Sequence, residues 1–181
     1  MIDWEEVLAS GKDFATWLDR AESEENRDKM ANALANLKIE EAIATGLKGL
    51  KRQVHVVAIA EDWCGDVVRH VPALQAMAQA TDKLRVRFVT REQYLDVFTR
   101  FLTNGGEAIP KFIFISDQFV ECGNWGPMPA SCRTLIARGK ACGDLGAARK
   151  LVSAAYAADP ELKIVVRELY ELVVIASAAT P

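Results

Sequence analysis

Residues 54–72, VHVVAIAEDWCGDVVRHVP, join an apolar run to a short acidic turn and then to an amphipathic segment. The run over 54–60 is rich in valine and isoleucine, which is typical of a strand buried on both faces of a sheet. The segment that follows predicts a helix of about four turns over 64–80. Cys64 therefore falls at the point where a buried strand ends and a helix begins.

Patterns on both sides of this stretch predict the rest of the sheet. They indicate a strand at 84–89, a helix at 91–102, and a hairpin of 111–116 with 119–125. A right-handed crossover places strands 54–60 and 84–89 side by side and parallel, with the hairpin on the far side of 54–60. The fold class is therefore α/β, with a four-stranded mixed sheet. An open sheet of this kind has its site at the carboxyl ends of its strands, which here is AEDWC.

Helical segments precede and follow this sheet. The expected organisation is an N-terminal helical extension over 1–50, a core over 51–128, and C-terminal helices over 129–181, all in one compact domain. Asp3 and Asp13 stand where N-cap residues are expected. The C-terminal segment breaks at 159–160 and is then apolar on more than one face, so it could pack within the chain or against a second subunit in a homodimer.

Composition excludes several classes of protein. The 181 residues are half apolar and carry a net charge of −3 with acids and bases interspersed, so no basic surface for nucleic acid is expected. No apolar run approaches the ~18 residues that span a membrane, and the acidic start lacks a secretory leader. Four dispersed cysteines do not suggest a disulfide framework. We expect a cytoplasmic, reduced protein that binds neither membrane nor nucleic acid.

Three landmarks in this order resemble the thioredoxin superfamily. They are Trp63-Cys64-Gly65 at the strand-to-helix junction, Pro72 eight residues after Cys64, and Ile109-Pro110 directly before a hairpin strand. The resemblance covers about 50–125 and implies a thioredoxin-like sheet flanked by helices. The phrases EDWCGD, TNGG..IP and WGP.P are also similar to those of bacterial thioredoxin-like proteins with a helical N-terminal extension.

The resemblance implies a catalytic Cys64 that faces a cis peptide bond at Ile109-Pro110. This chain departs from the family pattern at three places. Val67 stands where the second, resolving cysteine is expected, Ala58 replaces a buried acid, and Asp66 replaces a proline. No disulfide between neighbouring cysteines can form at this site, so a dithiol mechanism is disfavoured.

Groups near Cys64 are expected to shift the pKa of its thiol in opposite directions. A thiol at a helix N-terminus is stabilised as thiolate by free backbone N–H groups, and Gly65 lets a ligand approach the sulfur. The carboxylates Glu61, Asp62 and Asp66 oppose thiolate formation and disfavour an anionic ligand. Asp66 could instead cap the helix. The direction of the pKa shift stays open at this stage.

Two function classes follow. Cys64 could act alone in a thiol–disulfide oxidoreductase, through a mixed disulfide with a protein or a small thiol such as glutathione. Alternatively, the chain is a non-enzymatic module that binds a ligand in the groove between Trp63-Cys64 and Ile109-Pro110. Trp125 could line this groove or form a rigid turn. Neither class needs a cofactor.

The remaining cysteines and the two histidines give only weak indications of a functional site. Cys122 and Cys132 could in principle resolve Cys64, although burial as a small apolar residue suits Cys122 best, and Cys142 is expected in a loop. Cysteine spacings of ten residues match no zinc pattern. His70 is expected on a different helix face from the sulfur, and His55 is expected to pack in its strand.

Overall fold

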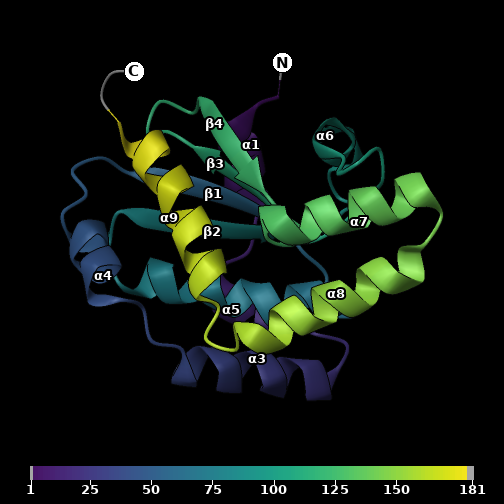
Figure 1. Ribbon diagram of the computed structural model, residues 1–181. Coiled ribbons are helices and arrows are strands. Elements are labelled where there is room, and N and C mark those ends of the chain that lie inside the picture. The colour runs from purple at the N-terminus through teal and green to yellow at the C-terminus, as the bar shows by residue number, and fades with distance from the viewer. Residues whose placement is uncertain (1, 179–181) are drawn as a thin grey trace.

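A four-stranded mixed sheet lies at the centre of the computed structural model, which describes residues 2–178 (Figure 1). The strands are β1 (Val54–Ile59), β2 (Leu84–Val89), β3 (Lys111–Ile115) and β4 (Glu121–Trp125). Their order across the sheet is β2-β1-β3-β4. β1 pairs parallel with β2 and antiparallel with β3, and β3 pairs antiparallel with β4. This confirms the predicted mixed sheet with β1 in its interior.

Helices occupy both ends of the chain and the segments between the strands. They are α1 (Trp4–Ser10), α2 (Phe14–Leu18), α3 (Glu24–Asn36), α4 (Glu41–Lys48), α5 (Gly65–Gln79), α6 (Leu95–Phe98), the 3₁₀ turn η1 (Thr99–Phe101), α7 (Ala130–Cys142), α8 (Leu145–Ala158) and α9 (Lys163–Ser177). Asp3 and Asp13 cap α1 and α2 as predicted, since each carboxylate accepts a hydrogen bond from a backbone N–H three residues later. Within residues 2–178 no helix combines the length and the apolar character needed to cross a membrane.

Two sequence-based expectations about local structure were wrong. The helix expected over 91–102 begins only at Leu95 and ends in the 3₁₀ turn. The backbone N–H groups of Arg91 and Gln93 donate to the side chains of Glu61 and Thr90, and these bonds hold residues 91–94 in turns. Cys142, expected in a loop, is the last residue of α7.

The helices form layers on the two faces of the sheet (Figure 1). α9 crosses β4, β3 and β1 and contacts α5, while α5 packs against β2 and is covered in turn by α3. α1 lies behind the sheet, against β1. The hydrophobic core is one continuous cluster that draws on side chains from Trp4 to Ala176. The helical extensions therefore share their core with the sheet.

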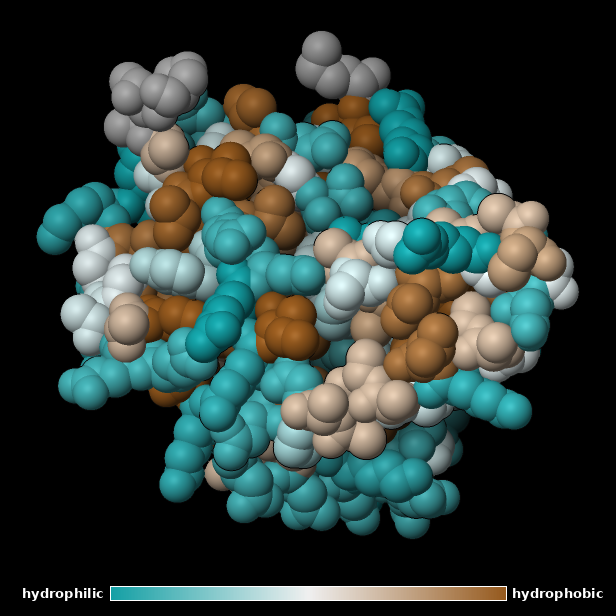
Figure 2. All heavy atoms as spheres, in the orientation of Figure 1, coloured by the Kyte–Doolittle hydropathy of each residue, from teal (hydrophilic) through white to brown (hydrophobic). Residues whose placement is uncertain are grey.

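The outer surface keeps some apolar side chains on α9. This helix buries Val165, Val166, Leu169, Val173 and Ala176. Ile164, Val174 and Ile175 are about half exposed, and Figure 2 shows apolar side chains among polar ones over this part of the molecule. One apolar face of α9 is thus used within the chain and the other is open to solvent.

α7 and α8 form an antiparallel hairpin at the right of Figure 1. Gly143 ends α7 in the left-handed conformation, with φ of 76°, and Asp144 then caps α8. The two helices touch at Gly139, where an added Cβ would lie 2.4 Å from the Ala148 Cβ and 2.9 Å from the Asp144 carbonyl oxygen. Glycine at this position sets the spacing of the hairpin.

We expect Gly139→Ala to destabilise the protein by about 1–3 kcal/mol, because the new methyl group must push α8 away from α7. Gly146→Ala is the matched control, since its Cβ would meet only the Asp144 side chain at 3.5 Å. The control should be neutral or more stable by up to about 1 kcal/mol through helix propensity. Urea denaturation measures both, and equal stability of the two variants would contradict the close packing at Gly139.

Candidate functional site

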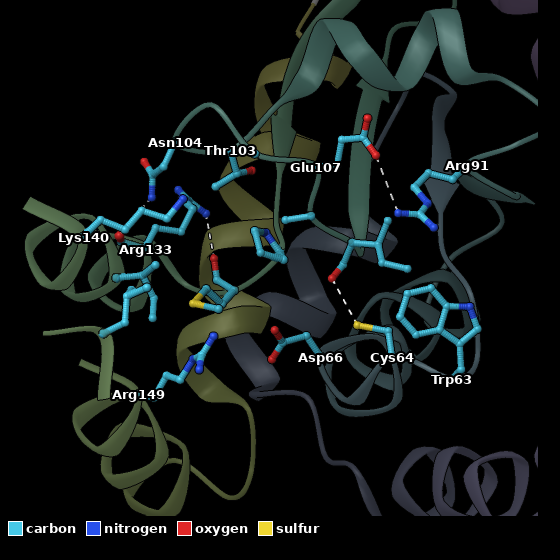
Figure 3. Close-up of a pocket in the computed structure, with 17 residues that line it drawn as sticks. Trp63, Cys64, Asp66, Arg91, Thr103, Asn104, Glu107, Arg133, Lys140 and Arg149 are labelled. Carbon is cyan, nitrogen blue, oxygen red and sulfur yellow. Dashed lines mark hydrogen bonds and ion pairs between the residues drawn. The ribbon is translucent and has the colours of Figure 1, made fainter. Parts of the chain in front are cut away.

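Cys64 is the N-cap residue of α5, and a four-residue turn separates it from the carboxyl end of β1. Its carbonyl oxygen accepts the first helical hydrogen bond, from the Val68 N–H at 3.0 Å. Its thiol donates to the carbonyl oxygen of Ile109, with 3.4 Å between Sγ and O (Figure 3). The Ile109–Pro110 peptide bond is cis. The thiol therefore faces the start of the β3 hairpin across the edge of the sheet.

A groove of about 400 Å³ opens beside this thiol. Trp63, Cys64, Asp66 and Arg91 line one side of it, and the segment 103–109 lines another. The α7–α8 hairpin closes the opposite side through Arg133, Ile136, Lys140, Leu145 and Arg149. Pro127 and Met128 also line the groove. The groove is thus shared by the sheet edge and the C-terminal helices.

The structure brings most of the predicted site residues to this place. Trp63 is 56% exposed, and the Arg91 guanidinium lies 5.7 Å from the centre of its ring. Ile109 lines the groove and Pro110 is buried behind it. Gly65 is exposed at the first turn of α5, and a Cβ there would meet nothing within 4 Å. The position next to Cys64 in the chain is therefore not covered by other side chains.

Trp125 does not line the groove, contrary to one reading of the sequence. It is 2% exposed, stacks on Phe112 of the neighbouring strand, and donates its indole N–H to Glu168 at 2.6 Å. Its place in β4, opposite Phe112, turns the ring toward the helices that cover the sheet. The sequence signal WGP does mark the groove, but through Pro127 and Met128.

The cationic residues of the hairpin were missed from the sequence. Arg133, Lys140 and Arg149 reach the groove from α7 and α8, far along the chain from the EDWCGD stretch. They look like ordinary surface charges in a helical pattern. One sequence signal could have indicated that these side chains lie close together. Gly143 predicts a turn between two helices, and such a turn brings cations on both helices to the same side of a hairpin.

The pKa of the Cys64 thiol is raised above its ordinary value. Burial is the main cause, and the negative charges of Asp66 and Glu61 add to it. Hydrogen bonds from the backbone N–H groups of Val67 and Asp66 act in the opposite direction but do not outweigh burial. The direction left open by the sequence is thus settled, and the resting form at neutral pH is the thiol.

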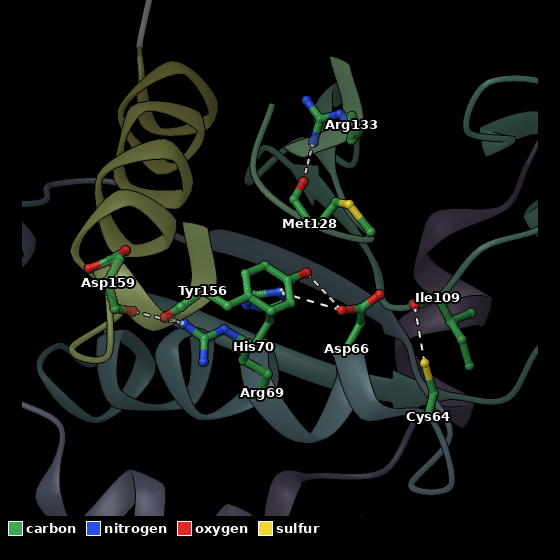
Figure 4. A network of polar contacts seen from close by, with 9 residues as sticks. All are labelled: Cys64, Asp66, Arg69, His70, Ile109, Met128, Arg133, Tyr156 and Asp159. Carbon is green, nitrogen blue, oxygen red and sulfur yellow. Dashed lines mark hydrogen bonds and ion pairs between the residues drawn. The ribbon is translucent and has the colours of Figure 1, made fainter. Parts of the chain in front are cut away.

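The three carboxylates near Cys64 are engaged with other groups. Glu61 accepts from the Arg91 N–H at 3.1 Å and lies 3.7 Å from its guanidinium. Asp62 accepts from the backbone N–H of Ser23 at 3.0 Å. Asp66 does not cap α5, because its carboxylate accepts from the Tyr156 hydroxyl at 2.8 Å (Figure 4).

A polar network ties α8 to α5 behind the groove (Figure 4). Arg69 donates to the carbonyl oxygens of Tyr156 and Asp159 at 2.8 Å each, and its guanidinium lies 4.4 Å from the centre of the Tyr156 ring. His70 is fully buried, with Nε2 3.2 Å from the Tyr156 hydroxyl. Burial lowers the pKa of His70 to about 3, aided by the nearby Arg69 charge. His70 is therefore neutral, and its 4.0 Å approach to Asp66 is not an ion pair.

The other cysteines lie outside the groove lining. All four thiols are free. Cys132 is 2% exposed, whereas Cys122, for which the sequence favoured burial, is only partly buried but does pack against the hydrophobic core. Over residues 2–178, no cluster of three or more His, Cys, Asp or Glu side chains could hold a metal ion.

We expect the stability of the protein to fall as the pH drops below about 6.5. The His70 pKa of about 3 lies below the ordinary value of 6.5, so the unfolded chain binds more protons between these pH values. This costs about 2 kcal/mol between pH ~7 and pH ~5. The raised pKa of Asp66 acts in the opposite direction, at lower pH.

Urea denaturation of the native protein and of His70→Gln across this pH range checks the effect. His70→Gln should lose most of the pH dependence even if it is less stable at pH ~7. A slope that survives unchanged in the variant would assign the dependence to another group.

We expect Asp66→Asn to lower the pKa of the Cys64 thiol, because the negative charge of Asp66 raises it. The amide oxygen can still accept the Tyr156 hydrogen bond, so the fold should be kept. The pH dependence of Cys64 alkylation measures the shift. Asp62→Asn is the matched control, since Asp62 does not contribute to the Cys64 pKa. A rate that responds equally to both changes would contradict a specific effect of Asp66.

Comparisons with known proteins bear on this architecture. A family model described as thioredoxin matches residues 11–143. A protein of unknown function from Pseudomonas aeruginosa, PA1234, has a crystal structure that superposes with a TM-score of 0.75 at 17% identity, covering 96% of this chain and 98% of that one. An HIV epitope scaffold gives a TM-score of 0.76 at 16% identity with the same coverage. A search among curated proteins finds no match.

Proposed function

This chain belongs to the thioredoxin family, and on that premise we propose that it carries out thiol–disulfide exchange with Cys64 as its single nucleophile. The observation that supports this most is the place of the thiol. Cys64 lies at the start of α5, with its sulfur both in the groove and 3.4 Å from the Ile109 carbonyl oxygen. A disulfide bound in the groove would be within reach of this sulfur.

The proposed reaction has two exchange steps. The Cys64 thiol first loses its proton to solvent, and the thiolate attacks one sulfur of the bound disulfide. A Cys64–ligand disulfide forms, the ligand's own S–S bond breaks, and the other half leaves as a thiolate. A second external thiolate then attacks the ligand sulfur of the mixed disulfide and releases the Cys64 thiolate. Each step exchanges one S–S bond for another, so no further oxidant is needed.

The second thiol must come from outside the chain. Val67 holds the place of a resolving cysteine and is fully buried in the first turn of α5. Cys122, Cys132 and Cys142 do not line the groove. A small thiol such as glutathione, or a thiol of another protein, therefore completes the cycle. Such thiols are abundant in the reducing cytoplasm, where we place the protein.

The start of α5 also stabilises the Cys64 thiolate once it forms. The backbone N–H groups of Asp66 and Val67 point toward the sulfur and stabilise its negative charge. The raised pKa makes the thiolate scarce at neutral pH but intrinsically more nucleophilic. The rate of exchange should therefore keep rising with pH well above neutrality.

One observation favours a second function. Because burial keeps Cys64 protonated, the same groove could bind an extended peptide or a small molecule without chemistry. In that case the thiol acts as a hydrogen-bond donor to Ile109, as it does in the free protein. The measured reactivity of Cys64 separates the two functions.

The test uses a protein in which Cys64 is the only thiol, made by Cys122→Ser, Cys132→Ala and Cys142→Ser. The probe is the neutral disulfide of 2-mercaptoethanol, and mass spectrometry follows the mixed disulfide between about pH 6 and pH 9. We expect folded protein to react at least about tenfold faster per thiolate than the same chain in urea, because the groove positions the disulfide.

Adding a second neutral thiol should then restore the free Cys64 thiol. Cys64→Ser in the same background is the control for reaction elsewhere. Folded protein that reacts more slowly than unfolded protein at every pH would overturn the exchange reaction in favour of the binding module.

A further inference from the structure

The charge of the groove is opposite to that of the whole chain. The chain has a net charge of −3. The groove lining contains four cationic side chains, Arg91, Arg133, Lys140 and Arg149, against the two carboxylates of Asp66 and Glu107, which leaves a local charge of +2. A cavity of one sign in a molecule of the other sign concentrates ligands that carry the complementary charge.

The carboxylates of the groove already have hydrogen-bond or ion-pair partners within the protein. Glu107 lies 3.7 Å from the Arg91 guanidinium, which also pairs with Glu61. Asp66 accepts from the Tyr156 hydroxyl, and burial raises its pKa. Glu61 and Glu107 therefore share the positive charge of Arg91. The hydrogen bond to Asp66 comes from a neutral hydroxyl, so the negative charge of Asp66 is not removed but is outnumbered by the three cations that the α7–α8 hairpin adds to the groove lining.

The cationic side chains of the α7–α8 hairpin, in contrast, have no carboxylate partner among the described residues. Arg133 donates to the carbonyl oxygen of Met128 at 2.7 Å, a bond that leaves its positive charge uncompensated. In the described part of the chain, no carboxylate lies within 4.0 Å of the charged groups of Arg133, Lys140 or Arg149. Three positive groups thus face the groove without an anionic partner.

Their position is across the groove from the reactive sulfur. Figure 3 shows Arg133, Lys140 and Arg149 on the side formed by α7 and α8, and Cys64 with Trp63 on the other side. Ile136, Leu145 and Met128 supply apolar surface in the same lining. The volume of about 400 Å³ is within the range of small-molecule sites.

From this arrangement we propose that the substrate is an anionic thiol or disulfide. Its carboxylate, sulfonate or phosphate group binds Arg133, Lys140 and Arg149 of the α7–α8 hairpin, while its sulfur reaches Cys64. The exchange with Cys64 rests on the function proposed above, whereas recognition of the anion does not. The C-terminal helices therefore select the substrate, and the thioredoxin-like sheet supplies the nucleophile.

The test compares two aromatic disulfides that release coloured thiols. 5,5′-Dithiobis(2-nitrobenzoate) carries two carboxylates, and 4,4′-dithiodipyridine is neutral. Both are reacted at low ionic strength with the protein in which Cys64 is the only thiol, and the quantity of interest is the ratio of the two rates. The ratio removes any change in the reactivity of Cys64 itself.

Lys140→Gln/Arg149→Gln should lower this ratio about tenfold, since each charge removed at roughly 7 Å in a solvated groove is worth about threefold. Arg138→Gln/Lys150→Gln is the matched control, because it removes the same charge from the same two helices outside the groove lining. Salt should reduce the ratio in the control and have little effect in the groove variant. Equal ratios in the two variants would overturn the anion site while leaving exchange at Cys64 intact.

A binding measurement tests the anion site without any reaction at Cys64. It decides the proposal even if Cys64 reacts with neither disulfide and the exchange function fails. Cys64→Ser is titrated with S-methylglutathione and with its diethyl ester, and amide chemical shifts on α7 and α8 report binding. Preferential binding of the acid, lost in Lys140→Gln/Arg149→Gln, supports the anion site. Equal binding of acid and ester, or no binding of either, rules it out.

Discussion

Burial of β1 on both faces and both edges is the constraint on which the rest of the structure depends. β1 pairs with β2 and β3 and is covered by α1 on one face and α9 on the other, so its backbone is paired on both edges and packed on both faces. The chain must leave the sheet at its carboxyl end, and α5 begins there with Cys64 as its N-cap. The Cys64 thiol is therefore positioned at the end of a strand that is paired on both edges and covered on both faces.

The same packing determines the chemistry of the thiol. Enclosure of Cys64 by the groove opposes ionisation more strongly than the N–H groups of α5 favour it. Asp66 adds a negative charge because the bond to Tyr156 holds its carboxylate near the start of α5. The protein thus has a protonated resting thiol. In the proposed exchange reaction, a substrate must be bound and oriented for the scarce thiolate to react with it.

The C-terminal helices cover the sheet and also hold cationic side chains opposite Cys64. The buried network of Arg69, His70 and Tyr156 fixes α8 against α5, and the close contact at Gly139 then fixes α7 against α8. Through these two contacts the cations of the hairpin come to face Cys64. Stability and the proposed recognition of the substrate therefore depend on the same hairpin.

The sequence by itself determined the sheet order, the helix caps at Asp3 and Asp13, and the place of Cys64 between strand and helix. These features follow from the periodicity and chemistry of neighbouring residues, which are local and readable along the chain. Only the tertiary structure decided that Trp125 is buried, that Asp66 bonds Tyr156, and that hairpin cations line the groove. Asp66 and Tyr156 are 90 residues apart, and no local pattern encodes which distant helix a polar side chain will meet.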